Sequence, residues 1–181
     1  MAHTPVNHPL GRLYRLVAGV VGAYILVFGI ATVARTWGDD LFARDNIWVL
    51  GLRTNLAFGI LSVVAGAVIV LAAIVGGNAP HLVNMYGGGV FLGAGIVMLT
   101  VLQTDLNFLN FSITTCIVSF VFGMALMTAG LYGKVGPADA AQAEEAYRHF
   151  AGPDPTPGRL STEGRYAHRP TEDPGEGHRF A

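Results

Sequence analysis

The sequence has little charge and only one cysteine. Charged residues make up 13% of the chain against 52% hydrophobic residues, which is too little charge to cover a water-facing surface. The net charge of −1 provides no basic field for DNA or RNA, which argues against nucleic-acid binding. The single cysteine, Cys116, cannot form an intrachain disulfide, and we interpret it as a buried, unreactive thiol.

No Asp, Glu, Lys, Arg or His lies inside any of four long apolar runs, which cover residues 16–34, 56–75, 82–102 and 111–132. Each run has roughly 20 residues, and at ~1.5 Å per residue such a helix matches the thickness of a bilayer's hydrocarbon core. We therefore predict an all-α, multi-pass membrane protein with four antiparallel transmembrane helices. The first run is too long for a signal peptide and lacks a small-residue cleavage site, so we expect it to be retained. The absence of charge also argues against a proton relay through the helices.

Polar and charged residues divide the rest of the chain. Residues 1–12 form a polar lead, and residues 13–133 form the four-helix domain. Residues 134–151 are rich in Ala and Glu after Pro137, which predicts a short juxtamembrane helix. Residues 152–181 consist mainly of Pro, Gly and charge, and we predict a disordered tail because such a composition buries too little surface.

The longest connection, residues 35–55, contains aromatic residues such as Trp37 and Trp48 between charged ones. This pattern is typical of a segment anchored at the membrane interface, so we expect the connection to lie along the membrane surface.

The runs also resemble one another. Superimposing the second run on the fourth pairs Ser62 with Ser119 and Gly66 with Gly123, and the first and third runs align more weakly. This predicts two tandem helical hairpins that share one orientation. Chance similarity among helices rich in Gly, Ala and Val is the alternative.

Small residues at four-residue spacing are frequent in the runs. Lipid provides no strong hydrophobic drive between helices, so close approach across small residues holds a bundle together. We therefore predict helix packing through Gly22, Ser62, Gly66, Gly89, Gly93, Ser119 and Gly123. The consecutive glycines 87–89 could instead mark a broken helix at a site, with possible polar lining by Asn84, Thr114 and Thr115.

No group of residues indicates a catalytic, cofactor or metal site. The six histidines never occur at a spacing suited to one metal ion. Asp39, Asp40 and Asp45 lack the glycine turn of a calcium loop, and Arg44 lies between them. No nucleophile–base pair, phosphate loop or haem motif is present. We predict no enzymatic activity and no cofactor.

Several strings at the edges of the connections resemble one family. They are residues 7–10 (Asn-His-Pro-Leu), 13–15, 51–55 (Gly-Leu-Arg-Thr-Asn), 76–78, 104–109 (Thr-Asp-Leu-Asn-Phe-Leu) and 115–120. Over residues 7–133 the chain resembles the four-helix actinobacterial membrane proteins grouped as domain of unknown function 4383. Ten arginines to one lysine suit a GC-rich genome of that kind. The resemblance implies the fold and a location in the cytoplasmic membrane, but no activity or ligand.

We expect a non-enzymatic accessory or interaction component of the cytoplasmic (inner) membrane, in contact with lipid and with a membrane-protein partner or a second copy. Four crossings place both termini on one side, where Arg12, Arg15, Lys134 and Arg148 outnumber Arg35, Arg44 and Arg53 on the other side by one, which favours cytoplasmic termini by the positive-inside rule. The main alternative is a small-solute transporter or channel subunit, which needs a hydroxyl-lined cavity near the triple glycine. An interfacial enzyme would need the connections that carry Asp39 and Asp105 to converge.

Overall fold

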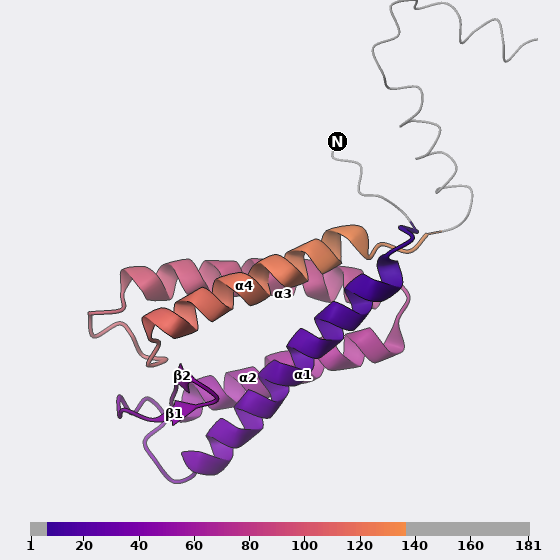
Figure 1. The fold of residues 1–181 in the computed structure, drawn as a ribbon. Coiled ribbons are helices and arrows are strands. Elements are labelled where there is room, and N and C mark those ends of the chain that lie inside the picture. The colour runs from indigo at the N-terminus through magenta and orange to yellow at the C-terminus, as the bar shows by residue number, and fades with distance from the viewer. Residues whose placement is uncertain (1–6, 137–181) are drawn as a thin grey trace, which may run out of the picture. The chain divides into compact units, whose positions relative to one another are not determined.

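The computed structural model describes residues 7–136, which form four helices and one small β-hairpin (Figure 1). These residues belong to the first of two compact units of the chain, Met1–Glu144. The elements are α1 (Gly11–Arg35), β1 (Trp48–Val49), β2 (Leu52–Arg53), α2 (Leu56–Val75), α3 (Ala79–Thr100) and α4 (Ile113–Tyr132). All four helices are long and apolar enough to cross a membrane, which confirms the expected number of helices of spanning length. Residues 134–136 are not helical, and the rest of the expected juxtamembrane helix and tail lies outside the described residues.

Three of the helices begin at residues other than those that hydropathy predicts. α1 already begins at Gly11, inside the expected polar lead. α3 begins at Ala79 and carries Pro80 in its first turn, where a missing N–H costs no hydrogen bond. α4 begins after Ser112, whose Oγ accepts a hydrogen bond from Thr115 N at 3.2 Å. Only α2 keeps the expected bounds at both ends.

The helices pack as two antiparallel pairs, α1 with α2 and α3 with α4, with less contact between the pairs (Figure 1). The antiparallel order follows from the contacts: Gly22 of α1 faces Ile69, while Gly29, further along α1, faces Val63. A Cβ atom at Gly29 would lie 2.5 Å from Val63 N, so the two backbones touch there. In lipid, such close van der Waals contact is what stabilises a helix pair.

The glycines that lie closest to a partner helix recur at seven-residue spacing, two to a helix. They are Gly22 and Gly29 on α1, Gly59 and Gly66 on α2, Gly88 and Gly95 on α3, and Gly123 and Gly130 on α4. Seven residues are close to two helical turns, so both glycines of a helix lie on one face. In both helix pairs, the closest contacts therefore occur at glycines seven residues apart.

The two helix pairs correspond in a register different from the expected one. A Cβ at Gly29 would meet the α2 backbone at Gly59, and one at Gly88 would meet the α4 backbone at Gly123. Gly59 therefore corresponds to Gly123 in the packing, whereas the sequence comparison pairs Gly66 with Gly123. The difference is one seven-residue period, because a pattern with that period aligns with itself after each such shift.

The first connection does not simply lie flat; part of it folds onto the helices. β1 and β2 pair antiparallel, and Leu50 and Gly51 between them both have positive φ, 45° and 82°. Two positive φ values in succession define the tight turn that matches the twist of a hairpin. Val49 and Leu52 are buried in one cluster with Phe28 of α1. The sequence does not reveal this hairpin because leucine is unfavourable at positive φ.

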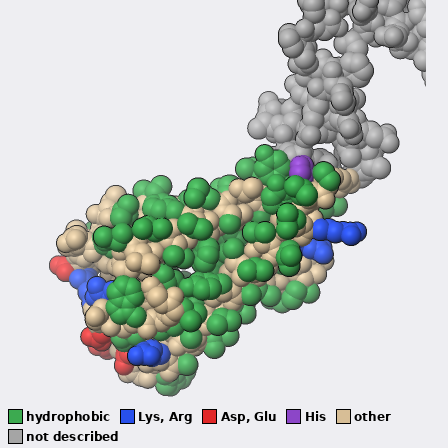
Figure 2. Space-filling model, in the orientation of Figure 1, with side chains coloured by type: hydrophobic (Ala, Val, Ile, Leu, Met, Phe, Trp, Pro, Cys, Tyr) green, Lys and Arg blue, Asp and Glu red, His purple; other side chains and the backbone are tan. Residues whose placement is uncertain are grey.

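Apolar side chains cover the visible flank of the helices, and charged side chains gather at its two ends (Figure 2). We call residues 36–55 and 101–112 the loop end, and residues 7–15, 76–81 and 133–136 the cationic end. Every Asp in the described part of the chain lies at the loop end, and no Glu occurs there at all. An apolar flank between two polar ends is the distribution that a bilayer requires.

Candidate functional site

Asn55 joins the two connections of the loop end. It is 1% exposed and caps α2, with its Oδ1 accepting a hydrogen bond from Phe58 N at 2.9 Å. Its Nδ2 donates to Phe108 O at 2.7 Å. The same amide therefore caps the beginning of α2 and holds the connection between α3 and α4 against it.

Asn107 and Asn110 also bind backbone groups. Asn110 has φ 56°, a conformation that asparagine adopts more readily than most residues, and its Nδ2 donates to Asp45 O at 2.8 Å and Thr54 O at 3.0 Å. Asn107 accepts from Phe111 N at 2.8 Å and donates back to Phe111 O at 3.0 Å. These amides hold the loops in place and leave little hydrogen-bonding capacity for a ligand.

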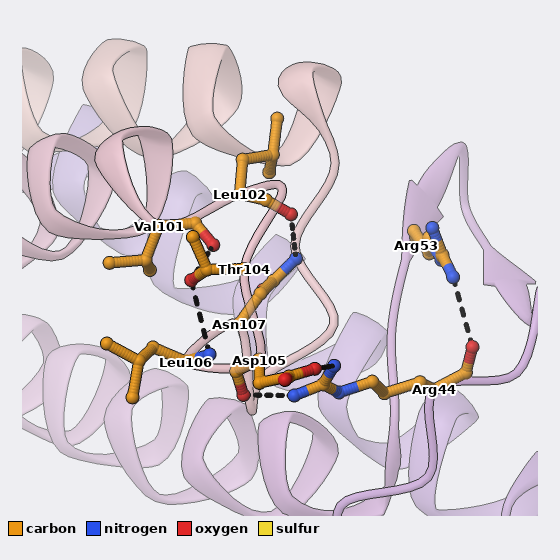
Figure 3. A network of polar contacts seen from close by, with 8 residues as sticks. All are labelled: Arg44, Arg53, Val101, Leu102, Thr104, Asp105, Leu106 and Asn107. Atoms are coloured by element: carbon orange, nitrogen blue, oxygen red, sulfur yellow. Dashed lines mark hydrogen bonds and ion pairs between the residues drawn. The ribbon is translucent and has the colours of Figure 1, made fainter.

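Figure 3 shows the charged part of the loop end, where Arg44 reaches across to Asp105. Arg44 Nη1 lies 2.9 Å from Asp105 Oδ1, its Nη2 donates to Asp105 O, and Arg53 Nη2 donates to Arg44 O at 3.0 Å. The side chain of Asp105 is fully exposed, so water screens this ion pair. The connection that carries Asp105 therefore contacts the first connection at Arg44, and not at Asp39. Arg53 Nε is buried without a partner among the described residues.

A cavity of about 220 Å³ lies between the two helix pairs, with residues from all four helices in its wall. Phe28, Phe58, Phe91, Phe111 and Phe122 contribute to it, so the wall is mainly aromatic and aliphatic. Its hydroxyl groups are those of Tyr24, Ser62, Thr115 and Ser119. Ser119 Oγ already donates to Phe91 O at 2.7 Å, and Tyr24 Oη donates to Leu50 O at 3.2 Å. The cavity is suited to apolar groups.

The expected polar lining does not come together. Thr115 lies in the wall of the cavity between the helix pairs, but Thr114 is exposed on the outer face of α4. Asn84 lies in a different cavity, at the cationic end. The reason is helical geometry: neighbouring residues such as Thr114 and Thr115 point about 100° apart.

Of the glycines expected to pack, three lie against a partner helix. A Cβ at Gly22 would be 2.7 Å from Ile69 Cγ2, one at Gly123 would be 2.7 Å from Leu92 Cγ, and one at Gly66 would overlap Leu26 N. Ser62 and Ser119 are buried on the same helices, 5% and 6% exposed.

Two glycines of α3 differ from that expectation. A Cβ at Gly89 would make only an ordinary 3.7 Å contact with Met127 Cε, and one at Gly93 would meet nothing within 4 Å. The close-contact face of α3 follows Gly88 and Gly95, so residues one or two positions away point off it. The expectation that Gly93 packs against a partner helix is therefore wrong.

A cavity with charged walls lies at the cationic end and measures about 480 Å³. Its wall includes His8, Arg12, Arg15, Asn84 and Lys134, and none of the residues that line it is acidic. Asn84 is 2% exposed, and its Oδ1 has no hydrogen-bond partner in the described part of the chain. The loop end offers no such deeply buried, unused amide.

Hydrogen bonds and aromatic contacts build the rim of the same cavity. Asn7 N donates to Lys134 O at 3.0 Å, which ties the chain before α1 to the chain after α4. His8, Tyr14 and Tyr132 form an aromatic cluster, in which the two tyrosine rings stack with centroids 5.5 Å apart. His81 is buried beside it, with Nδ1 2.6 Å from Gly130 O. The cavity is thus framed by both termini of the helical region.

No family model matches the chain, and no curated protein and no solved structure is similar to it. Within residues 7–136, no cluster of three or more His, Cys, Asp or Glu side chains could hold a metal ion.

Proposed function

We propose that the protein is a non-enzymatic accessory component of the cytoplasmic membrane, which acts by associating with a membrane protein or with a second copy of the chain. The observation that carries this proposal is the apolar wall of the cavity between the helix pairs. An ion or polar solute that leaves water needs polar groups to replace its hydration shell. Three of the four hydroxyls in this wall, those of Ser119, Tyr24 and Thr115, already donate to backbone carbonyls.

The loop end supports the same proposal. Its asparagine amides bind backbone groups of the two connections, so they serve the fold. An enzyme would need a nucleophile or base held near a position that substrate can reach. Asp105, the carboxylate where the connections meet, is paired with Arg44 in open solvent, where neither group gains unusual reactivity.

Cross-linking in native membranes tests the proposal. The full chain is cross-linked, purified in mild detergent, and its bound proteins and lipids are identified by mass spectrometry. We expect one partner, or a second copy of the chain, in fixed stoichiometry. Proteoliposomes that take up a small solute, at a rate that falls when Ser62 and Ser119 are changed to alanine, would contradict the proposal and favour the transporter alternative. Leucine at Val64, which is 58% exposed, is the matched control.

We also propose that both ends of the helical region face the cytoplasm. Within about 20 residues of the helix ends, the side of the termini carries four basic residues, Arg12, Arg15, Lys134 and Arg148, against three on the other side, Arg35, Arg44 and Arg53. A membrane-impermeant thiol reagent should therefore label Asp39→Cys in intact cells but not Ser161→Cys. The native Cys116 is 1% exposed and gives a low background. Labelling of Ser161→Cys alone would reverse the orientation. The cytoplasmic membrane itself is proposed on the resemblance to the actinobacterial family.

A further inference from the structure

The cavity at the cationic end combines positive charge with a buried, unused acceptor. Arg12, Arg15 and Lys134 lie in its wall, and no acidic residue among those that the structure describes does. Arg15 reaches from α1 toward the turn between α2 and α3, since a Cβ at Gly76 would lie 2.7 Å from its Nη1. Guanidinium and ammonium groups gathered in one cavity favour an anion, and arginine matches the geometry of phosphate oxygens.

Two helices add to this preference. α1 and α3 both begin at the cationic end, and neither has a side-chain hydrogen bond that caps its first turn. The first N–H groups of a helix have no intrahelical partner, and the helix dipole is positive at that end. The cavity therefore lies at the positive ends of two helices, although their contribution alone would not define a ligand.

The buried side chain of Asn84 indicates that the ligand also has a hydrogen-bond donor. Its side chain lines the cavity and is 2% exposed, and its Oδ1 has no partner among the described residues. Buried polar atoms are nearly always hydrogen-bonded, so this acceptor calls for a donor. A phosphate diester has no donor of its own, whereas a hydroxyl next to the phosphate would supply one.

We propose that this cavity binds a hydroxylated phosphodiester, the headgroup chemistry of an anionic glycerol phospholipid such as phosphatidylglycerol. The phosphate lies among Arg12, Arg15 and Lys134, and a headgroup hydroxyl donates to Asn84 Oδ1. The stacked Tyr14 and Tyr132 at the rim are typical of side chains at the level of lipid headgroups. The inference is independent of the proposed function and of the orientation of the chain.

Lipid binding to the full chain tests this proposal, with native mass spectrometry from neutral detergent as the readout. We compare phosphatidylglycerol with phosphatidylmethanol, which has the same charge but no headgroup hydroxyl, and with zwitterionic phosphatidylcholine. We expect the chain to bind phosphatidylglycerol most tightly, phosphatidylmethanol less tightly and phosphatidylcholine least tightly. Binding of all three lipids to the same extent would overturn the proposal.

Substitutions separate the phosphate from the hydroxyl. Arg12→Gln and Arg15→Gln should each weaken phosphatidylglycerol binding by about fivefold, the usual effect of one basic residue near an anionic lipid. Arg35→Gln, at the far end of α1, is the matched control and should leave binding unchanged. Asn84→Leu should remove the preference for phosphatidylglycerol over phosphatidylmethanol and keep the preference for both over phosphatidylcholine. Equal effects of Arg35→Gln and Arg15→Gln would show non-specific surface charge and would overturn the site.

Soluble ligands identify the source of the phosphate. Glycerol 3-phosphate should compete with phosphatidylglycerol only weakly, because it lacks the acyl chains that hold a lipid at the interface. Competition at the same concentration as the lipid would assign the cavity to a soluble phosphate and overturn the lipid assignment. This result does not bear on whether the protein is an accessory component.

Discussion

The loop end and the cationic end of the protein are both polar, but they use their polar groups differently. At the loop end, the amides of Asn55 and Asn110 donate to backbone carbonyls in distant parts of the chain, and the amide of Asn107 donates to a carbonyl within its own connection. At the cationic end, Asn84 is just as deeply buried, but its Oδ1 has no partner among the described residues. The amides at the loop end therefore stabilise the fold, whereas Asn84 Oδ1 can still accept a hydrogen bond from a ligand.

The comparison shows why the number of polar groups is a poor guide to a site. By composition, the loop end resembles an active site, with four Asp and two Arg near turns. Once each hydrogen bond is assigned, most of that capacity is used. A buried polar atom without a partner is the more informative observation, because its desolvation is uncompensated until something binds.

The contact between helices positions both ends, so its loss should have the largest effect. Gly66→Leu should lower the free energy of unfolding by about 3 kcal/mol, since the new side chain would overlap the backbone at Leu26. Gly123→Leu should cost less, about 1–2 kcal/mol, because Leu92, a side chain that can move, is the first atom group met. Thermal unfolding in detergent measures both.

Gly93→Leu is the matched control for these variants. Position 93 has open space around a Cβ, so leucine there should be neutral. A loss of stability at Gly93 as large as that at Gly66 would contradict the assignment of contact faces.

Asn110 provides the next largest effect and tests the loop end. Asn110→Ala removes the hydrogen bonds to Asp45 O and Thr54 O and places alanine at positive φ, so we expect a loss of about 2–3 kcal/mol. Asn110→Gly removes the same bonds without the backbone strain and should recover about 1 kcal/mol of that loss. Wild-type stability of Asn110→Gly would show that the amide does not hold the connections together.

Much of the fold follows from local sequence, and most of the candidate site does not. The helices could be predicted because each run must satisfy its own backbone within the hydrocarbon core. The register of the pairs could not, because Gly66 meets a glycine in either of two registers seven residues apart, Gly123 in one and Gly130 in the other. The bonds from Asn110 join residues more than 50 positions apart, and no local pattern encodes such a partner.

The cavity at the cationic end could be predicted in part from the sequence. Arg12 and Arg15 are visible in the sequence as residues that flank a helix, and Asn84 is visible as a polar residue in an apolar run. What the sequence does not show is that the chain after α4 returns to them and brings Lys134 into the same wall. The unused acceptor of Asn84 depends on three-dimensional packing alone.

Asn84 should respond to substitution in the opposite way from Asn110. In detergent without anionic lipid, Asn84→Leu should be neutral or stabilise the protein by up to ~1 kcal/mol, because it removes a buried acceptor that has no donor. The cavity beside it, about 480 Å³, leaves room for the leucine side chain. The unfolding temperature in lipid-free detergent measures this. A loss as large as that of Asn110→Ala would mean that Asn84 already has a partner within the protein.

The smallest effect should come from the most conspicuous polar contact, the ion pair between Arg44 and Asp105. The pair lies in open solvent, with the arginine side chain 45% exposed, so salt and water screen it and side-chain entropy opposes it. Asp105→Asn and Arg44→Gln should therefore leave the unfolding temperature close to that of the wild type, alone or together. Repeating the measurement at low and high salt sharpens the test, because a screened pair loses its small effect as ionic strength rises. A large loss of stability that is equal in both single variants and in the double variant would show that this pair, and not the asparagine amides, holds the two connections together.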